Sequence, residues 1–598
     1  MHIPDRLRTW RPDRWVIAVW ALAVMPVVVA TVRAIRRGWL PIGDNALVAI
    51  RAHDVFTLHH PWLGTWSSAS LDAGKDLNHP GPLLFDSVAP TVKLFGGHGG
   101  LAVGVMIVNI LAITTVAVFA WRRGGRRAAL VMLAAATVIG YVMGSELLFD
   151  PWNPHIVILA CLALLVCAWG VAVGDRWALP VYLALGSYCM QTHLGYAYLV
   201  PGLLVSSFLV GWVVGRRVPE SFRWPTRHTW IVSAGVVLVL WSQPLVEQFF
   251  GSGEGNLSRI LGARGSNGAK IGFHLALRLL ASVLTWAPWA LRRGFIDAVP
   301  HVEYSSPGVL GPVDVWGGLA AVGLLALVAA VVVALGVVAW RRRDALSLAL
   351  LGVASASVLL AFGSMVVMPI GPLGLTPHQM RWLWPITMFL WASVVFVGWR
   401  LLGLSERAGR GVEWALVALV GVVAGANLPT FVQPAGPATR ASQIPSVAVL
   451  DSQLGPLEGI GTVFFDTSNT PLLDNYTAAI MAELQRRGVT FLVSDSGLVR
   501  QLGNARQYHP GDAKVQLKLL FGLDAVAVPE GLDRVALYTP LTPAELDEFA
   551  TLYQRIGGGT PLSVDEQLRY SDLLIKAEQG SVAVVISPVI SPVISPVT

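Results

Sequence analysis

The fold is decided by residues 316–340, WGGLAAVGLLALVAAVVVALGVVAW, which are followed directly by Arg341, Arg342 and Arg343. The run contains no charged side chain. About 20 apolar residues are enough to cross the hydrocarbon core of a bilayer as one helix, and arginines beside such a span mark its cytoplasmic end. Residues 316–340 are therefore predicted to form a transmembrane helix whose C-terminal end faces the cytoplasm.

Runs of similar length and polarity occur along the first two-thirds of the chain. They lie at 15–35, 100–121, 128–146, 155–173, 177–191, 195–215, 229–246, 346–368, 382–402 and 412–428. Hydrophobic residues make up 54% of the 598 residues and charged residues 13%, which is about half the charged fraction of a soluble protein. The sequence therefore predicts a polytopic α-helical membrane protein with about eleven transmembrane helices.

Arginines alternate along the spans in the way the positive-inside rule requires. The loops predicted to be cytoplasmic contain Arg122, Arg123, Arg126 and Arg127, then Arg216, Arg217, Arg223 and Arg227, then Arg341, Arg342 and Arg343, and finally Arg400, Arg407 and Arg410. The net charge of +7 is therefore interpreted as a topology signal and not as a nucleic-acid-binding surface. The first span lacks the short apolar core and the small-residue cleavage site of a signal peptide. We predict a retained anchor and a multi-pass protein of the plasma membrane, with a cytoplasmic N-terminus.

With this topology the segments 36–99 and 247–315 and everything after about residue 429 face outward. Amphipathic stretches at 45–58 and 273–291 are expected to lie in the membrane interface. After residue 429 the composition changes to strand-like and helix-like segments, which predict an extracytoplasmic α/β domain. The strand-like segments are 462–466, 489–494 and 534–538, and the helix-like ones are 475–488, 542–555 and 563–578.

Three domains are therefore predicted. They are a transmembrane domain with outer juxtamembrane helices at 1–428, the extracytoplasmic α/β domain at 429–580, and a proline-containing repeat tail at 581–598. The tail ends in ISPVISPVISPVT and is expected to be disordered. All three cysteines lie in apolar runs, so no disulfide framework is implied.

Polar residues gather at the predicted outer ends of helices in four short motifs. These are Gly43-Asp44-Asn45, NHPGPLLF at 78–85, ELLFDPWNPH at 146–155 and PHQMRWLWP at 377–385. Each has a structural explanation of its own: Asp44 could cap a helix, the prolines could fix a turn, and Arg381 could anchor a helix at the interface. All four are nevertheless predicted to lie on the same side of the membrane.

Taken in order, the four motifs resemble those of the GT-C superfamily of membrane glycosyltransferases, in particular the protein O-mannosyltransferase and lipid A aminoarabinose transferase group. That group has an acidic residue just outside helix 1, matched here by Asp44, and a second one after helix 3, matched by Asp150. Its Lys-Pro-Pro-Leu-like turn is matched approximately by residues 79–83. Its His/Pro-Arg-Tyr-x-x-Pro-like motif is matched by His378 and residues 381–385. The resemblance covers residues 1–428, and actinobacterial cell-wall arabinosyl- and mannosyltransferases share this plan.

The resemblance implies transfer of a sugar from a polyprenyl-phosphate donor to a cell-envelope glycan, lipid or protein acceptor at the outer membrane surface. Asp44 is then the candidate general base. Arg381, with His378 and His79, would stabilise the leaving phosphate. The residues expected to position the sugar or the acceptor are Asn45, Asp150, Trp152, Asn153, His155, His193 and Tyr196.

Two departures from the family pattern concern the metal and the phosphate contact. Asn45 follows Asp44 where the family often has paired acids, and His79 stands where lysine is usual. A group formed by His53, Asp54, His59 and His60 leaves a divalent metal open, although its spacing matches no known metal motif. No cofactor is required by the sequence.

Three other functions are compatible with the same composition. A ligase or polymerase of polyprenyl-pyrophosphate-linked glycans would have large outer loops rich in arginine. A lipid-linked sugar transporter would carry charges at mid-membrane and inverted repeats, whereas the ionisable residues here gather at one surface. A non-catalytic envelope assembly protein is favoured only by the outer domain.

Overall fold

The computed structural model describes residues 13–251, 253–263, 270–285, 304–306, 309–310, 315–370, 374–433, 441–471 and 474–589. The chain divides into two compact units, and each consists of several stretches of sequence. The helical unit comprises Met1–Arg37, Trp62–Val88 and Ala102–Pro437. The α/β unit comprises Gly38–Pro61, Ala89–Leu101 and Ala438–Thr598.

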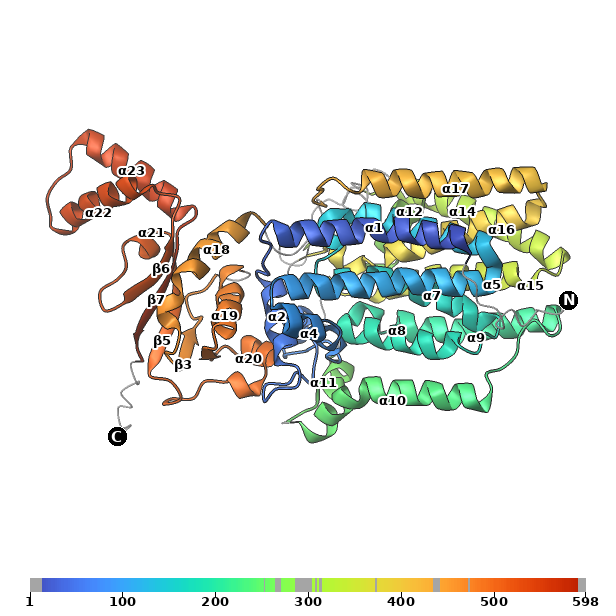
Figure 1. The fold of residues 1–598 in the computed structure, drawn as a ribbon, viewed down its shortest axis with the longest axis horizontal. Coiled ribbons are helices and arrows are strands. Elements are labelled where there is room, and N and C mark those ends of the chain that lie inside the picture. Colours follow the sequence, from blue (N-terminus) through green and yellow to red (C-terminus); the bar gives the residue numbers. More distant parts are fainter. Residues whose placement is uncertain are drawn as a thin grey trace. The chain divides into compact units, whose positions relative to one another are not determined.

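Long apolar helices make up the helical unit, and in Figure 1 they run along a common direction. The long helices are α1 (Arg14–Arg36), α5 (Gly99–Leu147), α7 (Ile158–Ala172), α8 (Ala178–Thr192), α9 (Leu199–Arg217), α10 (Arg227–Phe250), α12 (Gly272–Thr285), α14 (Gly318–Arg341), α15 (Ala345–Val367), α16 (Leu383–Leu402) and α17 (Glu406–Ala426). Shorter elements connect them: α3 (Ala69–Ala73), α4 (Leu83–Phe95), α6 (Asn153–Ile156), η2 (Leu194–Tyr196), α11 (Asn256–Gly262), the antiparallel pair β1 (Tyr304–Ser306) and β2 (Val309–Leu310), and η4 (Pro377–Met380).

The eleven predicted spans all appear as helices. Among the described residues, nine helices are long and apolar enough to cross a membrane. The predicted spans 100–121 and 128–146 are the two parts of α5, which is interrupted at Gly125 by a backbone with φ of 67°. The span 177–191 is α8, which has only 15 residues. The prediction of a polytopic α-helical membrane protein is thus confirmed.

The arginine-bearing loops of the helical unit are joined to one another. Arg122 and Arg123 both contact the carboxylate of Asp175, at 2.8 and 2.9 Å. Burial alone would raise the pKa of Asp175, but the hydrogen bond from Arg122 and the charge of Arg123 outweigh it and lower the pKa. Arg400 likewise contacts Asp344 at 2.6 Å. These links agree with placing the loops on one side of the membrane, and the identity of that side stays a prediction.

A five-stranded mixed sheet forms the centre of the α/β unit, in the order β4-β3-β5-β7-β6. β3 is parallel to β4 and β5, whereas β7 is antiparallel to β5 and β6. The strands are β3 (Thr462–Asp466), β4 (Thr490–Leu492), β5 (Val515–Phe521), β6 (Asp533–Tyr538) and β7 (Val582–Pro588). The helices are α2 (Asp44–Asp54), η5 (Ala441–Gln443), α18 (Ile444–Gln453), η6 (Gly455–Leu457), α19 (Tyr476–Arg486), α20 (Ser496–Leu502), η7 (Asn504–Arg506), α21 (Leu523–Val526), α22 (Pro543–Gly557) and α23 (Val564–Glu578).

Every predicted strand and helix of the α/β domain is present, as β3, β4, β6, α19, α22 and α23. The prediction of a disordered tail from residue 581 is wrong for Val582–Pro588, which form β7 between β5 and β6. The run VAVVI supplies β-branched residues that fit a buried strand, and Pro588 stands at the end of the strand, where a missing N–H is tolerated. Residues 590–598 lie outside the described part of the chain.

Helix α2, predicted to lie in the membrane interface, packs instead inside the α/β unit. Its apolar residues Ala46 and Ile50, with Ile42 before it, join Val447 and Ile480 in the main hydrophobic core. The apolar face recurs every three to four residues, and such a face can cover protein as well as lipid. The predicted domain boundary at residue 428 therefore assigns this segment to the wrong unit.

A buried ion cluster fixes the same segment to the C-terminal part of the chain. Asp54 accepts from Arg51 at 3.0 Å and from Arg506 at 2.9 Å. The amide of Gln485 on α19 also donates to Asp54, at 2.7 Å. Two buried guanidinium groups thus share one buried carboxylate.

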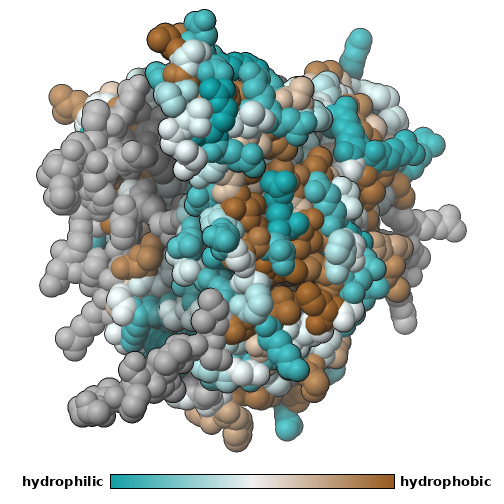
Figure 2. All heavy atoms as spheres, turned by 90° about the vertical axis from the view of Figure 1, so that its left-hand side faces the viewer, coloured by the Kyte–Doolittle hydropathy of each residue, from teal (hydrophilic) through white to brown (hydrophobic). Residues whose placement is uncertain are grey.

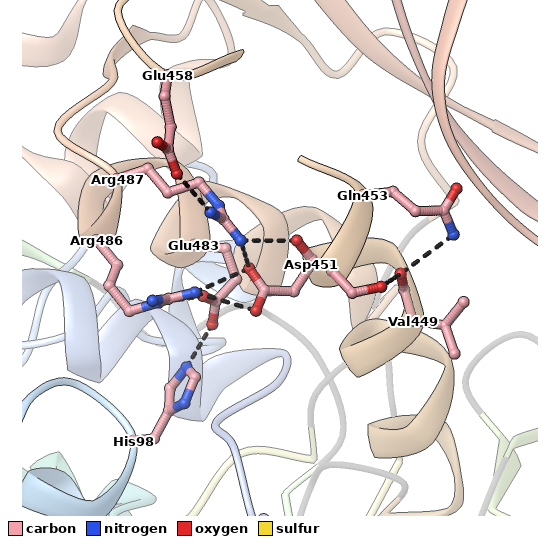
Figure 3. A network of polar contacts seen from close by, with 9 residues as sticks. His98, Val449, Asp451, Gln453, Glu458, Glu483, Arg486 and Arg487 are labelled. Carbon is pink, nitrogen blue, oxygen red and sulfur yellow. Dashed lines mark hydrogen bonds and ion pairs between the residues drawn. The ribbon is translucent and has the colours of Figure 1, made fainter. Parts of the chain in front are cut away.

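The stretch Ala89–Leu101 of the α/β unit is attached through His98 (Figure 3). Its Nε2 lies 2.5 Å from Oε1 of Glu483 on α19, and Arg486 holds the other carboxylate oxygen at 2.6 Å. Arg486 and Arg487 in turn share Asp451 of α18.

Figure 2 looks onto the α/β unit and shows hydrophobic residues in the middle of this face with hydrophilic residues among and around them.

Candidate functional site

The centre of the candidate site is the loop that connects α5 to α6. Nδ1 of His155 lies 2.6 Å from Oδ2 of Asp150, and the backbone N–H of Trp152 donates to Oδ1 of Asp150 at 3.3 Å. His155 is fully buried and Asp150 is 3% exposed. Pro151 and Pro154 restrict the loop, so the acid and the imidazole are held in one arrangement.

His79 connects this loop to the turn after α8. Its Nδ1 accepts from the backbone N–H of Leu194 at 3.0 Å, and its Nε2 lies 2.6 Å from the amide nitrogen of Asn153. Asn153 also donates to the carbonyl of Thr192 at 3.3 Å. Burial and the neighbouring His193 lower the pKa of His79 well below its usual value. His79 is therefore a neutral residue that orders the loops, and it does not supply the positive charge expected of it.

The turn that carries His79 is held by a residue that the sequence did not reveal. Oδ1 of Asn256 accepts from the backbone N–H of Asn78, and Nδ2 of Asn256 donates to the carbonyl of Asn78, both at 3.0 Å. Gly81 has no room for a side chain, because a Cβ there would lie 2.1 Å from Oε1 of Gln191 and 2.6 Å from Cγ of Pro244. The motif therefore needs glycine at this position.

The motif before α16 supplies the cation of the site. Arg381 is 1% exposed, and its guanidinium carbon lies 4.6 Å from the ring centroid of Trp384. Burial lowers the pKa of Arg381 to about 9, and the negative charge of Asp150 opposes that shift. Arg381 thus remains charged at neutral pH, next to a carboxylate that stabilises it.

Two more histidines lie against the same loops. The ring of His378 is 4.7 Å from that of Trp152, and its Nε2 lies 3.2 Å from Oγ1 of Thr376. The ring of His193 is 5.4 Å from that of His79 and 6.1 Å from that of Tyr196. Burial and the neighbouring His155 lower the pKa of His193 to about 4. His193 is consequently neutral as well.

Asp44 and Asn45 belong to the α/β unit, whereas the other candidates belong to the helical unit. Asp44 is the exposed first residue of α2, and Gly43, with φ of 52°, occupies the N-cap position. Asp44 is therefore not the N-cap of that helix, and Asn45 is buried. The residues that the structure brings together within the helical unit are His79, Asp150, Trp152, Asn153, His155, His193, Tyr196, His378 and Arg381.

Two members of the group considered as metal ligands, Asp54 and His60, have other contacts. Asp54 is bound by arginines, as described above, and Nδ1 of His60 accepts from the backbone N–H of Phe56 at 3.0 Å. Among the residues that the structure describes, no three His, Cys, Asp or Glu side chains are grouped as metal ligands. A divalent metal accordingly stays a hypothesis of the sequence.

No family model matches the chain, and no curated protein matches it. Among solved structures, the chain is similar to the crystal structure of ArnT from Cupriavidus metallidurans bound to undecaprenyl phosphate. The TM-score is 0.38 and the sequence identity 13%, over 88% of this chain and 95% of that chain. A likeness at this level carries no argument about activity.

Proposed function

We propose that the protein is a membrane glycosyltransferase that moves a sugar from a polyprenyl-phosphate donor to a cell-envelope acceptor. The observation that carries the proposal is the buried Arg381 beside the Asp150–His155 pair, at a place where three of the four resembling motifs meet. A cation inside a buried polar cluster is suited to a phosphate, because charge-assisted hydrogen bonds are strongest away from water.

Arg381 is assigned to the phosphate of the donor. Its planar guanidinium can donate two hydrogen bonds to phosphate oxygens and stabilise the negative charge that develops as the sugar leaves. His79 and His193 are neutral by burial, so the phosphate role expected of His79 passes to Arg381 and, next to it, His378. His79 and Asn153 instead hold the loops in place.

Proton transfer is assigned to Asp44, as the sequence motif implies. In the reaction the acceptor oxygen bonds to the anomeric carbon and the bond from that carbon to the phosphate oxygen breaks. The bonding electrons leave with the phosphate, and the hydroxyl proton passes to the carboxylate. Asp44 is exposed at the first turn of α2, so its carboxylate is accessible to an acceptor hydroxyl, as a general base must be.

The donor and the side of the membrane follow from the same resemblance. Arabinofuranose and mannose on a polyprenyl phosphate are the proposed donors, and the acceptor is a glycan, a glycolipid or a protein of the envelope. The α/β unit is proposed to lie outside the cytoplasm, because the arginine-bearing loops mark the opposite end of the helices.

The test is transfer by the purified full chain from synthetic polyprenyl-phosphate arabinofuranose and polyprenyl-phosphate mannose to cell-envelope acceptor fractions. Asp44→Asn and Arg381→Gln are each expected to reduce turnover by about 100-fold or more, the range reported for general bases and oxyanion donors. Asp547→Asn, an equally conservative change at an exposed position of α22, is the matched control. Full turnover in folded Asp44→Asn would refute the assignment of Asp44 as the general base. Unchanged donor binding in Arg381→Gln would refute the contact between Arg381 and the donor phosphate.

A further inference from the structure

Among the buried polar atoms of the site that have no hydrogen-bond partner within the described part of the chain, two have complementary hydrogen-bonding roles. They are Nε2 of His155 and Nε1 of Trp382. Both residues are almost completely inaccessible, with His155 at 0% and Trp382 at 1% exposure. Buried polar atoms in folded proteins are nearly always hydrogen-bonded, so a buried acceptor and a buried donor without partners require an explanation.

The partner of His155 determines what its free nitrogen can do. The carboxylate of Asp150, 2.6 Å from Nδ1, can only accept, so Nδ1 carries the hydrogen. In the neutral imidazole Nε2 is then an acceptor with a free lone pair. The indole nitrogen of Trp382 is the complementary group, because it can only donate.

Both atoms belong to the cluster around Arg381. Trp382 follows Arg381 in the chain, and a Cβ built on Gly195 would lie 3.4 Å from Nε1 of Trp382 and 2.9 Å from Nδ1 of His193. His155 acts electrostatically on His193, and Asp150 on Arg381. An acceptor and a donor without partners among the described residues thus lie in the cluster that contains Arg381, to which the donor phosphate is assigned.

A hydroxyl group fits this pair, because it donates one hydrogen bond and accepts another. We propose that His155 Nε2 and Trp382 Nε1 form a hydroxyl subsite, which recognises a hydroxyl group of the sugar on the polyprenyl-phosphate donor. The inference rests on the proposed function and deepens it: Arg381 binds the phosphate, and the hydroxyl subsite recognises the sugar attached to it. Asp150 is then a positioning residue, since it acts by fixing the tautomer of His155.

The test is direct binding to the full chain in lipid nanodiscs, which needs no turnover. The two probes are bare polyprenyl phosphate and the same lipid carrying arabinofuranose or mannose. His155→Gln and Trp382→Phe should each weaken binding of the sugar-bearing lipid about tenfold, the effect of one buried hydrogen bond. Binding of bare polyprenyl phosphate should be weakened less than binding of the sugar-bearing lipid in both variants, because the lost hydrogen bond is made to the sugar.

Trp399→Phe is the matched control. Its indole nitrogen is also buried and without a partner among the described residues, but Trp399 lies near the other end of α16, against Arg127. This variant should bind both lipids as the wild type does. Trp382→Phe keeps the bulk of the ring, so the inference stays testable if His155→Gln does not fold.

Three outcomes would overturn the inference. An equal loss for both lipids would mean that the subsite contacts the phosphate. Unchanged binding of both lipids in folded His155→Gln and Trp382→Phe would mean that the two atoms have only a structural role. If the wild type bound neither lipid, the proposed function would fail together with the inference, whereas the first two outcomes leave the proposed function intact.

Discussion

Replacing Asp54 by asparagine tests whether Gly38–Pro61 is an integral part of the α/β unit. The carboxylate of Asp54 is the only acid among the described residues that contacts Arg51 and Arg506, at 3.0 and 2.9 Å. All three side chains are at least 95% buried. The cluster therefore already carries one positive charge more than it can neutralise.

The expected effects follow from this charge balance. Asp54→Asn leaves two like charges buried without a counter-ion and should cost about 3–5 kcal/mol, as does the removal of one partner from a buried pair. Arg506→Gln leaves Arg51 and Asp54 as a neutral pair and should cost only about 1.5–3 kcal/mol, the value of a hydrogen bond to a charged group. Asp54 should thus contribute more to the free energy of unfolding than Arg506.

The assay is urea unfolding of the full chain in detergent, followed by brief proteolysis and detection of a C-terminal tag. Asp451→Asn is the control, since its carboxylate is partly exposed and its ion pairs should contribute about 1 kcal/mol or less. A wild-type unfolding midpoint for Asp54→Asn would refute the attachment of the segment. A larger loss of unfolding free energy for Arg506→Gln than for Asp54→Asn would refute the charge argument.

Three further predictions concern individual contacts. Burial alone would raise the pKa of Glu483, but its partners His98 and Arg486 lower this pKa below its usual value of 4.5. The contribution of the Glu483 carboxylate to the free energy of unfolding is therefore present above pH 4.5 and is lost as the pH falls further. Urea unfolding of Glu483→Gln should lack this pH dependence. Gly81→Ala should destabilise the helical unit by about 1–3 kcal/mol through overpacking against Gln191, seen as a lower thermal midpoint in detergent, and a wild-type midpoint would contradict the close packing. Asn256→Ala should cost about 2 kcal/mol or more because two buried backbone groups of Asn78 lose their partners, and faster proteolysis near residue 78 would report it.

The membrane helices were predictable because their signal is local. A run of about 20 apolar residues is sufficient in itself, and even α8 and the two parts of α5 were located. The role of α2 was not predictable, since its apolar face is the same whether lipid or Val447 and Ile480 cover it. The strand β7 was missed because VAVVI runs directly into a proline repeat whose composition indicates disorder.

In the candidate site, too, local features were predictable and contacts between distant residues were not. Asp150 and His155 were found together because they are five residues apart in one rigid loop. The contacts of His79 with Asn153 and Leu194, and of Asn78 with Asn256, join residues that are 74 to 178 positions apart. No pattern in a single sequence contains such pairs. The neutrality of His79 was also invisible, because it depends on burial by these distant residues.

The measurement that tests the central claim most directly is sugar transfer by the purified wild-type chain from two donors that differ only in the lipid linkage. One donor carries the sugar on a polyprenyl monophosphate and the other on a polyprenyl pyrophosphate. The account predicts transfer from the monophosphate donor and its loss in Arg381→Gln. Transfer from the pyrophosphate donor alone, or passage of either lipid across the bilayer without transfer, would contradict it.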